Sequence, residues 1–311
     1  MHTAPAKIIL FGEHAVVYGQ PAIAVPFTAL NATADSTPAP HGSGLTIYAP
    51  DIQRTIVVTK NKVEDVGDVL AYAAQRALVS LDVPMPDLTL TVRSTIPLAS
   101  GLGSGAAICT ALIRELTAAI GRPLEGDALN ALVFETEKIF HGTPSGIDNT
   151  VIVMGKPVYF VRGTPPETFH IQSALTFVIA DSGIAAPTRE SVGDVRKLYE
   201  ANPALYQTYF DHIGAIARTA RTQIERGDVP GIGRLMNENH DLLGTLTVSS
   251  PRIDDLVAAA RGAGALGAKV SGGGRGGNMI ALAEPSRAES VLTAVKAAGA
   301  VRGWITTLAA N

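Results

Sequence analysis

PLASGLGSGAA, residues 97–107, separates two segments of different hydrophobic period. Before it, residues 88–92 alternate apolar and polar side chains, which predicts a half-buried strand. After it, residues 106–120 are rich in Ala, Leu and Ile, which predicts a largely buried helix. Glycines at such a junction let the backbone approach a ligand, and the free N–H groups of the first helical turn attract an anion. The stretch is therefore either a phosphate-binding loop or an ordinary strand-to-helix turn.

Neither of the common nucleotide-binding signatures accounts for this loop. It lacks the Lys-Ser/Thr ending of the Walker loop, and Gly101-x-Gly103 is not followed by a third glycine at Rossmann spacing. If the loop binds phosphate, it belongs to a different class of nucleotide site.

The composition indicates a folded globular protein large enough for two domains. Of its 311 residues, 46% are hydrophobic and 17% charged. The formal net charge of −3 argues against nucleic-acid binding, and no apolar run approaches the roughly 20 residues that span a bilayer. Residues 1–7 do not resemble a targeting segment, so we expect a cytoplasmic protein. The single cysteine, Cys109, excludes an intramolecular disulfide and is expected to be a buried hydrophobe.

A first cluster of chemically active residues lies near the amino end. Lys7 lies near the start of an apolar strand predicted at residues 6–12, and Glu13 and His14 follow that strand before a second apolar run at residues 21–27. Burying such groups is unfavourable unless they are paired or used in chemistry. The alternative is a lysine that reaches solvent and a Glu–His pair on a turn.

A second cluster contains two carboxylates on either side of a loop rich in Gly and Pro. Glu137 lies near the end of a predicted helix over residues 126–140, and Asp148 follows the loop. Two such groups could divide the work of phosphoryl transfer, one holding Mg²⁺ and one facing the attacking hydroxyl. The alternatives are a solvated helix face for Glu137 and a turn or capping position for Asp148.

A third cluster is the glycine-rich segment at residues 269–278, which precedes an apolar strand at residues 279–283. Glycine loses much conformational entropy on folding, so this many glycines suit a loop whose backbone presses against a ligand. A flexible linker is the alternative, although a linker seldom runs directly into a buried strand.

The remaining pattern predicts further elements and one domain boundary. We expect a boundary at residues 163–173, where Gly and Pro cluster. The predicted strands form one hairpin at residues 45–49 and 55–58 and another at 151–153 and 158–161, with single strands at 176–180 and 303–308. The predicted helices cover residues 66–81, 191–226 with a break at Pro203, 229–243, 251–262 and 286–298.

Together, the three clusters resemble the GHMP kinase superfamily. Residues 7–24, 97–107 and 269–278 are similar to its three motifs, and residues 141–149 resemble the branch that phosphorylates mevalonate. The resemblance implies a two-domain α+β fold. Residues 1–170 would form an ATP-binding domain of the ribosomal S5 domain-2-like type, and residues 171–311 a ferredoxin-like domain.

The resemblance also implies roles for single residues. Asp148 would be the catalytic aspartate that accepts the proton of the C5 hydroxyl of mevalonate or orients that hydroxyl, with Lys7 beside it. Glu137 corresponds to the Mg²⁺ carboxylate. The ATP phosphates would be held by residues of the first glycine loop, namely Pro97, Ala99, Ser100, Gly101, Leu102, Gly103, Ser104, Gly105 and Ala106.

Substrate contacts are implied at Glu13, His14 and Thr188. The carboxylate of mevalonate needs a cation, for which Arg162 and Arg189 are the candidates. The expected cofactors are ATP and Mg²⁺, and the expected partner is a small molecule rather than nucleic acid or membrane. The resemblance is compatible with a homodimer.

Two departures from the family pattern stand out. The family often has tandem serines after Gly-Leu-Gly, whereas here Ser104 is followed by Gly105, so Ser104 or water would have to serve as the metal ligand. Arg275 and Asn278 interrupt the third glycine loop, and Arg275 could reach a phosphate or project into solvent.

Three alternatives to mevalonate phosphorylation remain open on the sequence. One is a sister kinase acting on phosphomevalonate, homoserine or a sugar. Another is a decarboxylase of the same fold, which the segment at residues 141–149 fits less well. The third is a ligand sensor, against which the intact Lys7, Glu137 and Asp148 argue.

Overall fold

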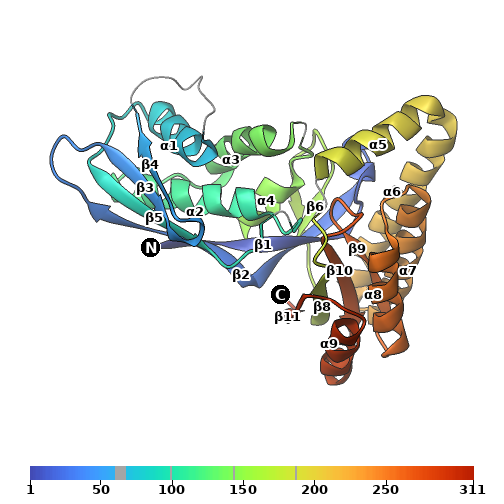
Figure 1. The fold of residues 1–311 in the computed structure, drawn as a ribbon. Coiled ribbons are helices and arrows are strands. Elements are labelled where there is room, and N and C mark those ends of the chain that lie inside the picture. Colours follow the sequence, from blue (N-terminus) through green and yellow to red (C-terminus); the bar gives the residue numbers. More distant parts are fainter. Residues whose placement is uncertain (60–67, 99, 143, 186–187) are drawn as a thin grey trace. The chain divides into compact units, whose positions relative to one another are not determined.

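The chain forms two compact units, described here from a computed structural model (Figure 1). The structure describes residues 1–59, 68–98, 100–142, 144–185 and 188–311, without the side chains of Phe140, His141 and Thr188. The first unit contains Met1–Lys7, Pro26–Leu98 and Gly103–Gly155. The second contains Ile8–Val25, Ala99–Leu102 and Lys156–Asn311. Both units are discontinuous in sequence, and the predicted division between residues 170 and 171 stays a prediction.

In its described residues, the first unit combines a sheet with four helices. Its strands follow the order β4 (Arg54–Val58), β3 (Leu45–Ala49), β5 (Leu88–Ser94) and β2 (Ala22–Pro38). β3 pairs antiparallel with β4, as the predicted hairpin requires, and parallel with β5. The 3-10 turn at Pro50–Ile52 connects β3 to β4. The helices are α1 (Val69–Ser80), α2 (Ser104–Ala119), α3 (Gly126–His141) and α4 (Ile147–Met154).

α2 is the central helix of this unit, because α1, α3, α4 and β5 all pack against it. Its buried side chains are mostly small or aliphatic, as the Ala- and Leu-rich sequence predicts. Cys109 is among them, and burial raises the pKa of its thiol to about 12, which confirms the expected buried hydrophobe.

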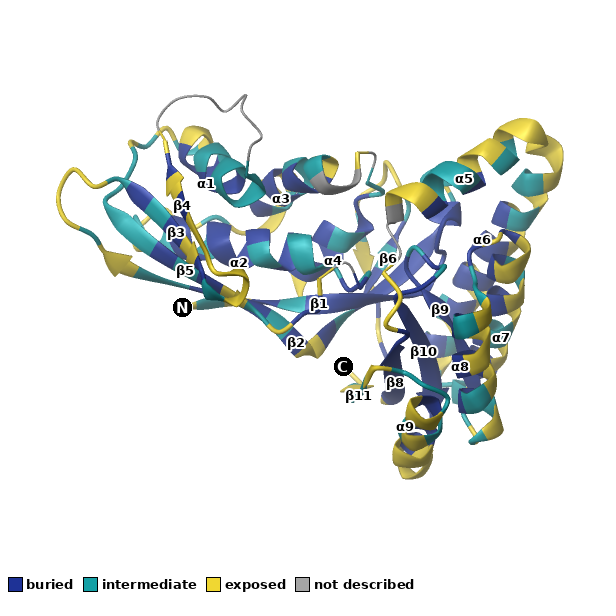
Figure 2. Ribbon diagram, viewed as in Figure 1, coloured by how far each residue is buried: buried dark blue, intermediate teal, exposed yellow. Residues whose placement is uncertain are grey.

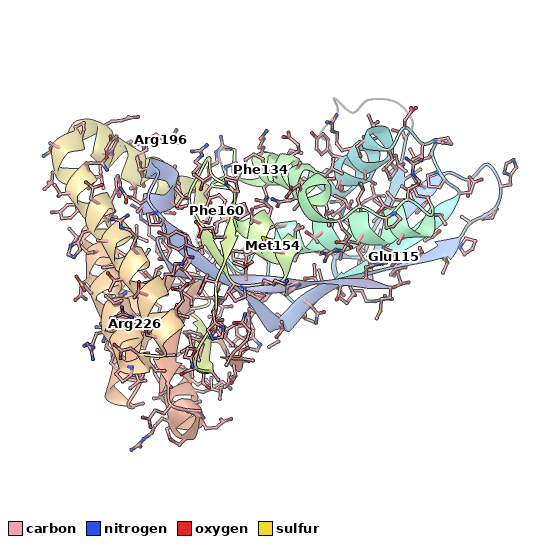
Figure 3. All side chains as sticks on the ribbon, turned by 180° about the vertical axis from the view of Figure 1, so that it is seen from behind. Glu115, Phe134, Met154, Phe160, Arg196 and Arg226 are labelled. Carbon is pink, nitrogen blue, oxygen red and sulfur yellow. The ribbon has the colours of Figure 1, made fainter. Side chains whose placement is uncertain are left out.

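Glu115 of α2, labelled in Figure 3, links the helix to the strands beneath it. The Ser36 hydroxyl of β2 donates to its Oε1 at 2.6 Å. The His2 ring donates from Nδ1 to its Oε2 at 2.7 Å, at the start of β1 (His2–Phe11). These contacts hold the part of β1 that leads to Lys7 against α2.

The second unit contains a four-stranded antiparallel sheet. Its strands follow the order β11 (Arg302–Leu308), β8 (Leu175–Asp181), β10 (Asn278–Ala283) and β9 (Gly267–Ser271). In chain order this is a βαββαβ arrangement, with α5–α8 after β8 and α9 before β11. The expected ferredoxin-like architecture is confirmed.

The helices of the second unit pack on this sheet or on one another. They are α5 (Thr188–Ala201), α6 (Pro203–Arg226), α7 (Val229–Thr245), α8 (Pro251–Gly262) and α9 (Ala288–Ala297). The predicted break at Pro203 separates α5 from α6, because Asn202 caps α6 and proline occupies its first position. α8 and α9 pack on the sheet, in which β8, β9 and β10 are buried and the edge strand β11 is partly exposed (Figure 2). The smaller elements are η1 (Ala15–Tyr18), β6 (Val158–Phe160), β7 (Glu167–Thr168) and η3 (Pro285–Arg287).

The predicted strand at residues 151–153 is wrong, because these residues belong to helix α4. A short apolar run of this kind can be a buried strand or a buried helix, and periodicity does not distinguish them. Gly146 and Gly155 set the limits of α4, since both adopt left-handed conformations at its two ends. Asp148 therefore lies in the first turn of a helix rather than in a loop.

Within the described ranges, each helix is too short or too polar to cross a lipid bilayer.

Candidate active site

Lys7 and Asp148 form an ion pair in the first unit. Lys7 lies on β1 with a side chain only 3% exposed, and its Nζ is 2.9 Å from Oδ1 of Asp148. The Asp148 side chain is 25% exposed, so this carboxylate is the part of the pair that solvent or a ligand reaches. Two residues 141 positions apart in sequence are thus brought together, as the resemblance implies.

Glu137 is buried in the same unit, on α3, which packs against α4. Burial raises the pKa of its carboxyl to about 8, the nearby charge of Asp148 acts in the same direction, and the charge of Lys7 opposes both effects. Lys7, Asp148 and Glu137 therefore form one electrostatically coupled cluster.

Replacing Glu137 by Gln should change how stability depends on pH. Between its ordinary pKa and about 8, the folded wild type holds a proton that the unfolded chain has released, so its stability falls as pH rises. A glutamine side chain cannot titrate. The free energy of unfolding of the variant, relative to that of wild type, should therefore increase by roughly 2–4 kcal/mol between pH 5 and pH 9. Urea denaturation without divalent metal measures this difference. Glu135→Gln, on the same helix but exposed to solvent, is the control, and parallel pH curves for wild type and Glu137→Gln would contradict the assignment.

The beginning of α2 approaches Lys7 closely. Gly103 adopts a left-handed conformation and precedes the first helical residue, Ser104. A Cβ on Gly103 would lie 2.7 Å from Cδ1 of Ile152 and 3.0 Å from Cγ of Lys7, so only glycine fits there. The N–H groups of Ser104, Gly105 and Ala106 belong to the first helical turn, where backbone donors have no intrahelical acceptor. The geometry favours the phosphate-binding interpretation over an ordinary turn.

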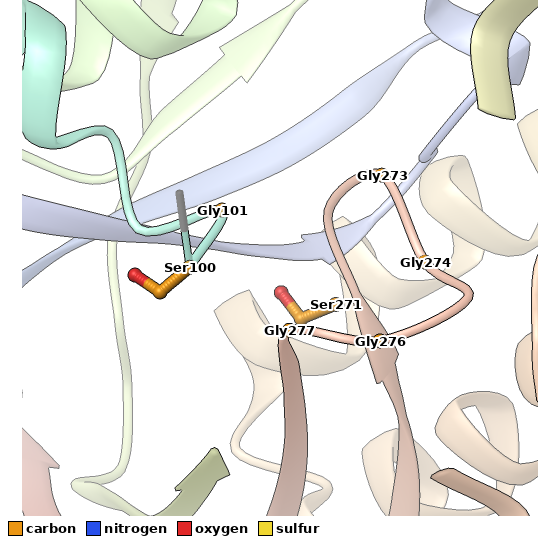
Figure 4. Close-up of a pocket in the computed structure, with 7 residues that line it drawn as sticks. All are labelled: Ser100, Gly101, Ser271, Gly273, Gly274, Gly276 and Gly277. Carbon is orange, nitrogen blue, oxygen red and sulfur yellow. The ribbon is translucent and has the colours of Figure 1, made fainter. Parts of the chain in front are cut away.

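The second unit contains a small pocket lined mainly by glycine backbone (Figure 4). Its lining residues come from the first glycine loop and from the segment between β9 and β10, namely Ser100, Gly101, Ser271, Gly273, Gly274, Gly276 and Gly277. Asn278 joins the two segments, because its Nδ2 donates to the carbonyl of Ser100. The third glycine cluster is thus a structured loop rather than a flexible linker.

Glu13 and His14 are both buried beside this loop, within the second unit. Glu13 forms an ion pair with Lys269 of β9, whose side chain is fully buried. The His14 ring donates from Nε2 to the carbonyl of Gly273 at 3.1 Å. Burial lowers the pKa of His14 to about 4 and the charge of Arg275 acts in the same direction, so this imidazole is neutral near pH 7. The sequence did not single out Lys269 by itself, although a lysine in an apolar strand is the kind of residue that needs a partner.

Arg275 contacts other residues of the second unit instead of projecting freely into solvent. Its Nη1 is 2.6 Å from Oδ2 of Asp194, and its Nε donates to the carbonyl of Thr247 at 2.9 Å. Of the two possibilities that the sequence left open, a side chain free in solvent does not describe Arg275, which attaches the glycine loop to α5 and to the turn after α7, and contact with a phosphate stays a prediction.

The structure gives less support to the other predicted substrate residues. Arg162 does not lie on a strand, because β6 ends at Phe160, and its side chain is exposed. Arg189 is exposed in the first turn of α5. Ala99 and the side chain of Thr188 lie outside the described part of the chain.

The residues of the first unit fit a magnesium ion. Mg²⁺ is usually held by one or two carboxylates, with phosphates and water completing its coordination. Glu137 and Asp148 supply two carboxylates whose mutual repulsion contributes to the raised pKa of Glu137, and a divalent cation would relieve it. No group of three His, Cys, Asp or Glu that could hold a metal occurs in the described part, so a site made by protein ligands alone is not indicated there.

Two protein-family models match this chain. The family model for the GHMP kinases N terminal domain matches residues 66–156, and the model for GHMP kinases C terminal matches residues 220–301. The two matches lie on either side of the predicted domain boundary.

Similar proteins include several archaeal mevalonate kinases. The mevalonate kinase of Pyrococcus horikoshii is 36% identical over 96% of this chain and 92% of its own length. The mevalonate kinase of Aeropyrum pernix is 34% identical over 94% of this chain and 91% of its own length.

Solved structures show the same likeness. The crystal structure of L. major mevalonate kinase in complex with R-mevalonate is 30% identical, covers 100% of this chain and 96% of that one, and superposes with a TM-score of 0.86. The Methanococcus jannaschii mevalonate kinase has the same TM-score at 23% identity, covers 100% of this chain and 99% of its own, and supports the fold alone.

Proposed function

The chain belongs to the mevalonate kinase family of the GHMP kinases, and we propose that it transfers the γ-phosphoryl group of ATP to the C5 hydroxyl of mevalonate. The observation that carries this proposal is the Lys7–Asp148 ion pair, 2.9 Å long and open to a ligand on the aspartate side. Relatives of this chain named mevalonate kinase support the choice of alcohol.

In the proposed reaction, Asp148 accepts the proton of the C5 hydroxyl as the hydroxyl oxygen attacks the γ-phosphorus. The bond from that phosphorus to the bridging oxygen of ADP breaks, so the products are mevalonate 5-phosphate and ADP. Lys7 keeps the Asp148 carboxylate in place and stabilises negative charge on the oxygens around the reacting centre.

Glu137 is the residue we assign to Mg²⁺, with Ser104 as a second candidate ligand. The metal, when bound, neutralises phosphate charge. Because a metal ligand must be deprotonated, Glu137, whose pKa burial raises to about 8, would have to lose its proton to hold the metal. The N–H groups at the start of α2 and the glycine-lined pocket are the phosphate-binding elements we assign to the two units.

Several residues are candidates for binding mevalonate. The carboxylate of mevalonate needs a cation, and Arg162 and Arg189 remain the proposed candidates. Glu13 forms an ion pair with Lys269, and His14 donates to the carbonyl of Gly273. Because both side chains are buried in these contacts, we assign them to the support of the glycine loop in preference to direct contact with substrate. A homodimer stays a prediction.

An activity assay with several alcohols tests the proposed function. Purified protein with ATP and Mg²⁺ should release ADP with mevalonate and form mevalonate 5-phosphate without CO₂. Phosphomevalonate, homoserine and a sugar serve as competing substrates, and diphosphomevalonate serves as the decarboxylase substrate. Release of CO₂ would identify the protein as a decarboxylase and not a kinase. Turnover of another alcohol in place of mevalonate would show that the assigned substrate is wrong. Absence of turnover with every compound would favour a ligand sensor.

A further inference from the structure

A chain of hydrogen bonds joins α3 to the first turn of α4. Asn149 donates from Nδ2 to Oδ1 of Asn130 at 2.7 Å, and Asn130 donates from Nδ2 to Oγ1 of Thr150 at 3.3 Å. The Thr150 hydroxyl then donates to the carbonyl of Gly146 at 2.7 Å. Each of these three bonds pairs an N–H or O–H donor with an oxygen acceptor.

These bonds surround Asp148 without involving it. Asn149 and Thr150 directly follow Asp148, and Gly146 lies two residues before it. Asn149 and Thr150 are 2% and 3% exposed, so their side chains face the interior of the unit while the Asp148 carboxylate reaches solvent. Among the described residues, Oδ1 of Asn149 has no hydrogen-bond partner, which leaves the bond to Asn130 as the polar contact of that side chain.

Asn130 and Glu137 lie on the same helix, α3. The two residues are seven positions apart on α3, and this spacing places them on the same face of a helix. One helix therefore bears Glu137 and, two turns earlier, the amide that holds the Asp148 turn. A shift of α4 along or around its axis would change the distances from Asp148 to Lys7 and to Glu137, and it would first have to break the bonds to Asn130.

We propose that Asn130 is a positioning residue for phosphoryl transfer, which fixes the first turn of α4 so that Asp148 keeps its place beside Lys7. This inference rests on the proposed function, because Asp148 is taken as the group that receives the hydroxyl proton. In this proposal Asn130 acts through its hydrogen bonds to Asn149 and Thr150 and not on the substrate itself. Misplacing a catalytic group by about 1 Å can lower a rate by on the order of 100-fold, so the loss of Asn130 should appear mainly in kcat.

The test compares two threonine substitutions of the same kind. Thr150→Val removes a hydroxyl that belongs to the network, and Thr136→Val removes an equally buried hydroxyl that donates to Val133 within α3. In steady-state kinetics with ATP, Mg²⁺ and mevalonate, Thr150→Val and Asn130→Ala should lower kcat by on the order of 10-fold to 100-fold, with both KM values within about threefold of wild type. Thr136→Val should keep the wild-type kcat. The double variant Asn130→Ala/Thr150→Val should be about as slow as the slower single variant.

A merely structural role predicts a different result. If Asn130→Ala and Thr136→Val lose activity in proportion to their loss of thermal stability, or if Asn130→Ala keeps its kcat, the inference is overturned. A crystal structure of Asn130→Ala separates this outcome from failure of the proposed function. The separation between Nζ of Lys7 and Oδ1 of Asp148 should exceed about 4 Å, the limit of an ion pair, in the variant whether or not mevalonate is the substrate, and an unchanged ion pair would refute the positioning role.

Discussion

Asp148→Asn should lower kcat by on the order of 100-fold or more while ATP binding stays close to wild type. The amide keeps the size of the carboxylate, so the first turn of α4 is preserved, but it no longer accepts the hydroxyl proton. It also removes the negative partner of Lys7. Steady-state kinetics gives kcat, and calorimetric titration with ATP gives the affinity.

Asp127→Asn is the matched control for this variant. Asp127 is also an acidic residue in the first turn of a helix of the same unit, but it is exposed on α3 and lies outside the cluster of Lys7, Glu137 and Asp148. The control should keep wild-type activity. Full activity in Asp148→Asn would remove Asp148 from the mechanism.

Lys7→Met should reduce kcat by a similar factor, on the order of 100-fold, because a fixed positive charge is lost from the reacting centre. Methionine has a comparable length and suits the buried path of the lysine side chain, so we expect the variant to fold. The Asp148 carboxylate that it leaves behind is 25% exposed and can be hydrated. Circular dichroism checks the fold, and the same kinetic assay measures the loss.

Lys156→Met is the control for the lysine substitution, since Lys156 is exposed at the surface of the second unit. It should leave kcat unchanged. A Lys7→Met enzyme that folds and works at the wild-type rate would exclude Lys7 from charge stabilisation.

Most of the architecture could be predicted from the sequence because the signals are local. The alternation in β5, the Ala-rich pattern of α2 and the proline that separates α5 from α6 each depend on neighbouring residues. The ferredoxin-like order of β8–β11 followed from the resemblance and is confirmed by the strand pairing.

The sequence could not establish which residues pair across the fold. The ion pair of Glu13 with Lys269 joins residues 256 positions apart, and local patterns carry no information about such distant pairs. The bond from Asn278 to Ser100 is of the same kind, with 178 positions between the partners. The resemblance implied a substrate contact for Glu13, which stays a prediction, and the structure adds its pairing with a buried lysine.

The misassigned segment at residues 151–153 has a local cause. Val151, Ile152 and Val153 favour strands by propensity, but packing of α4 against α2 and α3 outweighs that preference. The helix begins at Ile147, so its first turn also contains Asp148, whose side chain is 25% exposed, and the buried Asn149 and Thr150.

The central claim is that a lysine and an aspartate act as one unit on a single hydroxyl, and the double variant Lys7→Met/Asp148→Asn tests it most directly. When two residues act together in one step, replacing either of them already removes most of their joint contribution to kcat. We predict that kcat of the double variant, measured with ATP, Mg²⁺ and mevalonate, lies within about threefold of the slower single variant. A kcat reduced by the product of the two single losses would show that the residues act independently and would contradict the account.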